Sequence, residues 1–147
     1  MNNNKKIRGM IFCLSGFFLL LDQFLKWQAT HSWIQAKLLH NYFGWQPFLN
    51  QGAAFGLPLP SWLIVLLTIP VVVVIGFLIS QQYQNAWQLT AWVLLLTGAI
   101  SNLFDRIFYE HVIDYFAFVT GIINLADVLI VIGLLIYLFK NTCKRNI

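Results

Sequence analysis

Long apolar runs alternate with shorter polar interruptions along the chain, and four of the runs are candidates for membrane spans. A spanning helix needs about 20 mostly apolar residues, or somewhat fewer where polar or aromatic anchors flank it. Runs of this kind cover approximately residues 10–27, 62–80, 87–104 and 122–139. Pro70 falls inside the second run, where a membrane helix tolerates a kink. The pattern therefore predicts four transmembrane helices.

Two connections between these runs are longer than a turn requires. They cover about residues 28–61 and 105–121, and both are too apolar for flexible linkers. We expect them to pack on the outer membrane surface as a small sheet or an interfacial helix. The predicted fold class is an all-α polytopic membrane protein, with four transmembrane helices and a small extracytoplasmic β-sheet or interfacial helix. Residues 1–147 are expected to form one domain.

Composition and charge agree with a membrane protein. Hydrophobic residues make up 59% of the chain and charged residues only 10%, against about 25% charged in soluble domains. Six of the nine basic residues lie near the termini, which the positive-inside rule places in the cytoplasm. No basic stripe lies between them, so we expect no nucleic-acid partner. The terminal basic residues are Lys5, Lys6, Arg8, Lys140, Lys144 and Arg145.

Four of the five acidic residues lie inside or at the edge of the apolar runs. A charged side chain at the centre of a membrane helix costs about 2.5–3.5 kcal/mol even on the lower scales, so such residues are rare and usually functional. With four spans and cytoplasmic termini, these acids and the polar residues beside them all come to one membrane face. They are Asp22, Asp105, Asp114 and Asp127, with Asn102, Arg106 and Asn124.

Asp22 and Lys26 are four residues apart with the acid first, the favourable order for an ion pair on one helix. The simplest interpretation is a structural pair that snorkels at the interface and orients the first helix. Asp105 is expected to cap or brace the bundle. Arg106 shares a helix face with Asn102, and its five donors could hold a carbonyl or a lipid phosphate.

Asp114 lies 13 positions before Asp127 in the sequence, with Gly121 between them, so they do not belong to one continuous helix. A turn could still bring them together. Two carboxylates that share a site cannot easily both ionise, so they share a proton. Aspartic proteases use this arrangement to activate water and protonate the leaving amine. A buried structural acid remains the alternative for either residue taken alone.

Small residues follow Asn50, in the run Asn-Gln-Gly-Ala-Ala-Phe-Gly that ends at Gly56. One interpretation is a tight turn, where glycine supplies unusual backbone angles. The other is a backbone, including Gly52, that lets a substrate chain approach closely. Residue physics alone leaves both open.

Five segments in order carry a resemblance to a known family. They are Asp22 with Lys26, residues 50–55 (NQGAAF), 98–106 (GAISNLFDR), 112–116 (VIDYF) and 124–127 (NLAD). The chain resembles the lipoprotein signal peptidases (signal peptidase II), bacterial membrane aspartic endopeptidases, over nearly its whole length. It departs from the family pattern at Thr97, Ser101 and Ile123, where the family usually has Gly, Gly and Phe. None of these changes touches a carboxylate.

The resemblance implies an enzyme that removes the signal peptide of diacylglyceryl-modified prolipoproteins, just before the lipidated cysteine. It implies that Asp114 and Asp127 are the catalytic pair and that Asp105 supports the site. It also implies a bacterial inner-membrane location with the active site near the extracytoplasmic face, contact with membrane lipids, a monomer, and neither metal nor cofactor. The residues expected to line the substrate site are Asn50, Gly52, Asn102, Arg106 and Asn124.

Two other classes remain as alternatives. Intramembrane acids also mark proton paths, so a small proton-coupled transporter or channel subunit is one. Such a path should place polar groups across the full membrane depth, whereas the predicted second to fourth spans have almost none toward the cytoplasmic end. A structural scaffold is the other, and it would leave the clustered aspartates without a purpose.

Overall fold

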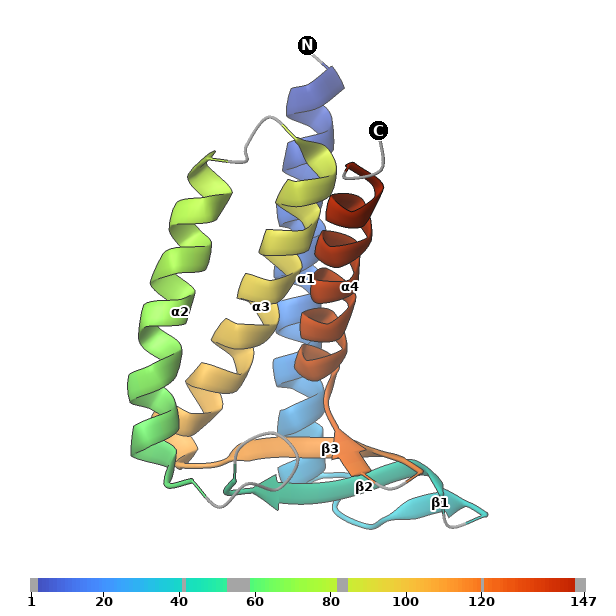
Figure 1. Ribbon diagram of the computed structural model, residues 1–147. Helices are drawn as coiled ribbons and strands as arrows, with labels where there is room; N and C mark the ends of the chain where they lie inside the picture. The colour runs from blue at the N-terminus through green and yellow to red at the C-terminus, as the bar shows by residue number, and fades with distance from the viewer. Residues whose placement is uncertain (1–2, 41, 53–58, 82–84, 120, 145–147) are drawn as a thin grey trace.

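Four helices stand side by side, and a small sheet lies across one end of them (Figure 1). The computed structural model describes residues 3–40, 42–52, 59–81, 85–119 and 121–144, with side chains described up to residue 139. Helix α1 begins and helix α4 ends at the end of the bundle opposite the sheet (Figure 1). The helices of the described chain are α1 (Asn3–His31), α2 (Ser61–Gln81), α3 (Ala86–Tyr109) and α4 (Leu125–Lys144).

The sheet joins the two long connections that the sequence separates. Its strands are antiparallel in the order β1 (Lys37–Leu39), β2 (Phe43–Asn50), β3 (Val112–Phe118) and β4 (Gly121–Ile123). Strand β2 comes from the first connection and β3 from the second. Their register pairs Asn50 with Val112 and Phe48 with Asp114, so the end of β2 lies beside the first acid of the predicted pair.

Three helices, α1, α2 and α3, are long and apolar enough to cross a membrane by length and composition. The described apolar part of α4, Leu125–Phe139, is shorter. Ile75 is the only residue of α2 that is buried within the described structure, and many of the other apolar side chains of this helix are exposed. The apolar exterior indicates a membrane-embedded protein.

Helix α3 is the central element, because it contacts each of the other three helices. Its contact with α4 is close at Gly98, where an added Cβ would collide with the Ala126 carbonyl and lie 2.7 Å from Ile130 Cγ1. A Cβ added to Gly133 of α4 would likewise lie only 2.9 Å from Leu95 Cγ. Small residues at a helix contact let backbones approach closely in membranes, where packing drives association. The two helices that carry most of the site are therefore held tightly together.

The helix bounds differ from those predicted. Helix α1 extends well beyond residues 10–27, and α3 continues to Tyr109, which places Asp105 and Arg106 within the helix. Helix α4 begins at Leu125 instead of residue 122, because residues 121–123 pair with β3 as a strand. Hydropathy locates the apolar part of a helix, whereas its ends depend on backbone hydrogen bonds. Of the two structures expected for the long connections, the described residues form the sheet.

Candidate active site

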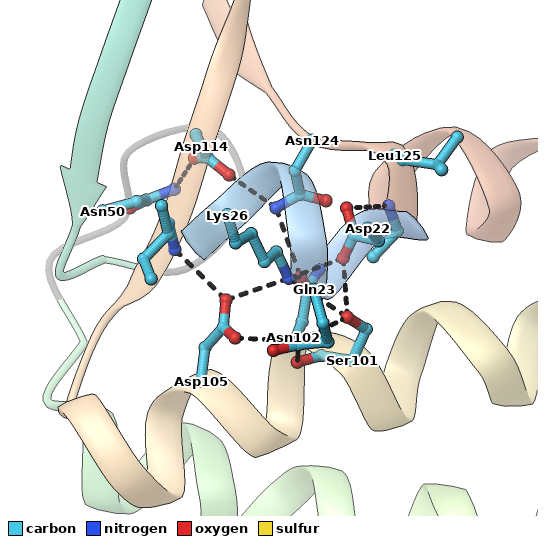
Figure 2. A network of polar contacts seen from close by, with 12 residues as sticks. Asp22, Gln23, Lys26, Asn50, Ser101, Asn102, Asp105, Asp114, Asn124 and Leu125 are labelled. Carbon is cyan, nitrogen blue, oxygen red and sulfur yellow. Dashed lines mark hydrogen bonds and ion pairs between the residues drawn. The ribbon is translucent and has the colours of Figure 1, made fainter. Parts of the chain in front are cut away.

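Lys26 is buried between two carboxylates, as Figure 2 shows. Its Nζ lies 2.8 Å from Asp22 Oδ2 and 2.9 Å from Asp105 Oδ2. The three side chains are at most 1% exposed. The expectation that Asp22 and Lys26 snorkel at the interface is therefore wrong. A buried charge is tolerated when it is paired and hydrogen-bonded, and here one ammonium joins α1 to α3.

The Asp22 carboxylate also accepts hydrogen bonds from three neutral donors. Ser101 donates from Oγ at 2.6 Å, the Tyr115 hydroxyl at 2.9 Å, and the Ala126 backbone N–H at 3.3 Å. These donors come from α3, β3 and α4. Because a buried carboxylate needs several donors to stay charged, Asp22 fixes the mutual positions of all the elements around it.

The Asp105 carboxylate is also surrounded by hydrogen-bond donors, whereas the side chain of its neighbour Arg106 reaches the Gly52 carbonyl. Gln23 Nε2 donates to its Oδ1 at 3.1 Å, and the Ile113 backbone N–H donates to its Oδ2 at 3.2 Å. Asp105 thus braces α3 against both α1 and β3. Sequence reasoning missed three members of this network: Gln23, Ser101 and Tyr115. Their polar groups in otherwise apolar segments are the signal that could have found them.

The start of α4 is capped by side chains, and this capping positions Asp127. Asn124 Oδ1 accepts from the Asp127 backbone N–H at 2.9 Å, while Asp127 Oδ2 accepts from the Asn124 backbone N–H at 3.2 Å. This reciprocal pattern is a capping box. The next N–H, that of Leu125, donates to the Tyr115 hydroxyl at 2.9 Å. The Asp127 carboxylate also lies at the positive end of the helix dipole.

The Asn124 side chain joins the two predicted catalytic acids. Its Nδ2 donates to Asp114 Oδ1 at 2.6 Å, and its backbone N–H and Oδ1 are the groups that hold Asp127. Asn50 Nδ2 donates to the other oxygen of Asp114 at 2.9 Å (Figure 2). Asn102 Nδ2 donates to Asp127 Oδ1 at 2.8 Å. The structure therefore brings Asp114 of β3 and Asp127 of α4 into one amide-lined site.

Burial, together with the negative charge of Asp127, raises the pKa of Asp114 to about 6, although the amide donors Asn50 and Asn124 oppose the shift. The side chain is only 1% exposed. Burial, together with the charge of Asp22, also raises the pKa of Tyr115, so its hydroxyl keeps its proton and donates. A carboxyl group that titrates near neutral pH beside a second carboxylate is suited to proton transfer.

Arg106 closes the site on the side of the loop that follows β2. Its Nη2 donates to the Gly52 carbonyl at 3.0 Å, and the Gly52 N–H donates to Asn50 Oδ1 at 3.1 Å. The Arg106 guanidinium also feels the charges of Asp114 and Asp127. Its Nε is buried and has no hydrogen-bond partner among the described residues. Residues 53–56 of the small-residue run lie outside the described part of the chain.

Comparison with known proteins gives the family. The model of signal peptidase (SPase) II matches residues 14–142. The chain belongs to the signal peptidase II family. Its resemblance to lipoprotein signal peptidases, inferred from the motifs, is confirmed.

Relatives in this family are similar over most of their length. The lipoprotein signal peptidase of Chlamydia pneumoniae is 36% identical over 121 residues, which cover 76% of this chain and 68% of the relative. That of Halothermothrix orenii is 32% identical over 142 residues, covering 89% of this chain and 96% of the relative. That of Serratia marcescens is 32% identical over 147 residues, covering 92% and 86%.

Two solved structures share the fold. Both are described as bacterial membrane enzyme structures obtained by the in meso method. One has a TM-score of 0.76 at 21% identity, covering 91% of this chain and 90% of its own. The other has a TM-score of 0.72 at 19% identity, covering 90% of this chain and 92% of its own.

Membership of a signal peptidase family indicates a protease, and it favours this class over a transporter or a scaffold.

Proposed function

We propose that the chain is an aspartic endopeptidase that removes signal peptides from diacylglyceryl-modified prolipoproteins, cutting just before the lipidated cysteine. Asp114 and Asp127 are its catalytic pair. The observation that carries this proposal is that Asn124 donates to both carboxylates, from its side-chain Nδ2 to Asp114 and from its backbone N–H to Asp127, although the two acids belong to different elements. One residue therefore holds the two acids close together. Two acids with separate structural roles would not need such a shared partner.

Cleavage follows from a pair that shares one proton. One carboxylate takes a proton from a water molecule as the water oxygen bonds to the scissile carbonyl carbon. The other gives its proton to the amide nitrogen as the carbon–nitrogen bond breaks. The raised pKa of Asp114 supports this scheme, since a carboxyl group with a pKa of about 6 can gain and lose a proton near neutral pH. The two apparent pKa values belong to the pair.

The remaining polar residues orient the pair and receive the substrate. Asn50, Asn102 and Asn124 donate to the carboxylates and determine the direction of each oxygen. Arg106 and Gly52 form the adjoining wall, where a peptide backbone can be bound. Asp105 acts as a support behind this wall, through its contacts with Lys26 and the β3 backbone. The pair of Asp22 and Lys26 is structural.

The same proposal includes an orientation in the membrane. All four helices cross the bacterial cytoplasmic membrane as one domain over residues 1–147, with both termini in the cytoplasm and the sheet outside. The basic residues near the start of α1, Lys5 and Lys6, lie at the end of the bundle away from the sheet, which agrees with the positive-inside rule. Lipid contacts cover the exposed apolar faces, and a monomer is sufficient for the chemistry.

The test is cleavage of a purified, diacylglyceryl-modified precursor by the wild type and by Asp114→Asn and Asp127→Asn. We expect both variants to lose cleavage by at least about a hundredfold, because each removes one member of the proton-transfer pair. Glu110→Gln is the matched control, since this acid is exposed at the end of α3, and it should cleave at the wild-type rate. Cleavage by both Asp→Asn variants at the wild-type rate would refute the pair. Failure of the wild type to cleave would refute the substrate.

A further inference from the structure

The side-chain amide of Asn102 lies between a buried cation and the proposed catalytic pair. Lys26 Nζ donates to Asn102 Oδ1 at 3.0 Å, and Asn102 Nδ2 donates to Asp127 Oδ1 at 2.8 Å. An ammonium can only donate, and an ionised carboxylate can only accept. The two neighbours therefore select the same orientation of the amide, with its oxygen toward Lys26 and its nitrogen toward Asp127.

We propose that Lys26 is a positioning residue for cleavage: its ammonium orients the Asn102 amide, which in turn holds the Asp127 carboxylate. This inference rests on the proposed function and deepens it. The described hydrogen bonds and ion pairs of the Lys26 ammonium go to Asp22, Asp105, Ser101 and Asn102. None of these contacts is with Asp127, so the hydrogen-bonded connection from Lys26 to Asp127 runs through Asn102.

Lys26 is suited to this role because it cannot move away. Its side chain is 1% exposed, and Asp22, Asp105 and Ser101 Oγ hold its Nζ at 2.8, 2.9 and 3.2 Å. With Asn102 Oδ1, four acceptors surround the ammonium. Because the ammonium is held in one position, it holds the Asn102 amide in one orientation, whereas a mobile ammonium would not.

A second donor shows why the orientation matters. Asn124 Nδ2 donates to Asn102 Oδ1 at 3.2 Å as well as to Asp114 Oδ1 at 2.6 Å. A rotation of the Asn102 amide by half a turn would place its Nδ2 against the Asn124 Nδ2 and its oxygen against the Asp127 carboxylate. Both new contacts are repulsive, and both carboxylates of the pair would shift. Correct placement of Asn102 thus holds the geometry of both acids.

The experiment separates this orienting donor from the charge of Lys26. Removing Lys26 alone leaves two buried carboxylates unpaired, so both variants are made with Asp105→Asn. One carries Lys26→Gln, whose amide can still donate to Asn102 Oδ1, and the other carries Lys26→Met, which has no donor. The two double variants have the same net charge and nearly the same side-chain volume. Thermal unfolding in detergent checks that both are folded.

The readouts are kcat and KM for the diacylglyceryl-modified precursor. We expect the Met variant to have a kcat about tenfold to a hundredfold below that of the Gln variant, because misplaced catalytic groups slow the chemical step. KM should agree between the two, since both carry Asp105→Asn behind the wall that binds the peptide and neither alters Arg106 or Gly52. Equal kcat values in the two folded variants, whether high or low, would overturn the proposal.

A second arm does not depend on changes at Lys26. Asn102→Asp keeps an oxygen for Lys26 and replaces the nitrogen that donates to Asp127 with an oxygen that cannot, and thermal unfolding in detergent checks that this variant is folded. We expect kcat to fall by about tenfold or more with little change in KM. A wild-type kcat in Asn102→Asp would overturn the proposal. Failure of the wild type itself to cleave the precursor would instead refute the proposed function, so the two failures are distinguishable.

Discussion

At the scale of single residues, the site is built from carboxylates whose oxygens all receive donors. Asp114 is the clearest case, since amide nitrogens of Asn50 and Asn124 reach its two oxygens. These donors favour the ionised form, while burial and the nearby Asp127 disfavour it. The pKa of Asp114 is the balance between these effects, and each can be removed separately.

Titration of Asp114 should follow that balance. We expect the wild-type carboxyl to titrate at about 6. Asn50→Ala removes a donor that stabilises the ionised form, so the pKa should rise. Asp127→Asn removes a negative charge that destabilises the ionised form, so it should fall. Infrared titration of the carboxylic C=O band, assigned by its loss in Asp114→Asn, measures both shifts. Shifts in the opposite directions would contradict this account.

At the scale of elements, the position of Asp127 depends on how α4 begins and on how closely α4 packs against α3. The Tyr115 hydroxyl of β3 accepts from Leu125 and donates to Asp22 of α1, so one oxygen atom joins three elements. Gly98 of α3 lies against the Ala126 carbonyl one residue before Asp127. Both contacts can be altered without touching a carboxylate.

Tyr115→Phe should lower the free energy of unfolding by about 1–3 kcal/mol, because a buried N–H and a buried carboxylate each lose a partner. Thermal or denaturant unfolding in detergent measures this. Tyr109→Phe serves as the control, since Tyr109 is exposed and its ring contacts with Phe104 and His111 are kept. We expect the control to stay within about 0.5 kcal/mol of the wild type. Equal stability of the two variants would show that the hydroxyl does not hold α4.

Gly98→Ala should destabilise the protein by about 1–3 kcal/mol, the usual cost of overpacking, because the new methyl collides with the α4 backbone. The displacement of α4 should also reduce cleavage. Gly76→Ala in α2 is the matched control, because nothing lies within 4 Å of its added Cβ. Unfolding and cleavage measured on both variants test the prediction. Gly98→Ala as stable and active as Gly76→Ala would disprove the close contact.

At the scale of the whole molecule, the two ends of the bundle differ in chemistry. Basic residues lie near the start of α1, whereas the sheet and all the carboxylates described above lie at or near the other end (Figure 1). This polarity determines the orientation that we propose, because basic segments are retained in the cytoplasm. It also separates the polar site from the exposed apolar surface of α2.

Cysteine labelling tests the proposed orientation. In a background with Cys13→Ser and Cys143→Ser, we expect Lys37→Cys on exposed β1 to react with a membrane-impermeant thiol reagent in intact spheroplasts. Lys5→Cys at the exposed start of α1 should react only after permeabilisation. Labelling of Lys5→Cys in intact spheroplasts would reverse the proposed orientation or place the two positions on the same side.

The predicted apolar runs correspond to the four described helices, with shifts at their ends. Hydropathy and composition are local properties, so the amino-acid sequence alone was enough to predict helices in an apolar environment. The motifs likewise led to the family, and the separation of Asp114 from Asp127 placed them on different elements. None of these predictions depends on knowing which distant segments of the chain contact each other.

Only the tertiary structure decided which groups meet. Lys26 has Asp22 one turn away, yet its second carboxylate, Asp105, is on another helix. Pairing of β2 with β3 brings Asn50 to Asp114, and residues 121–123 form a strand because β3 lies beside them. Such contacts depend on burial and register between distant segments. A buried charge is stable only when it is paired, and its partners can come from segments far away in the sequence. The local sequence therefore does not predict which residues they are.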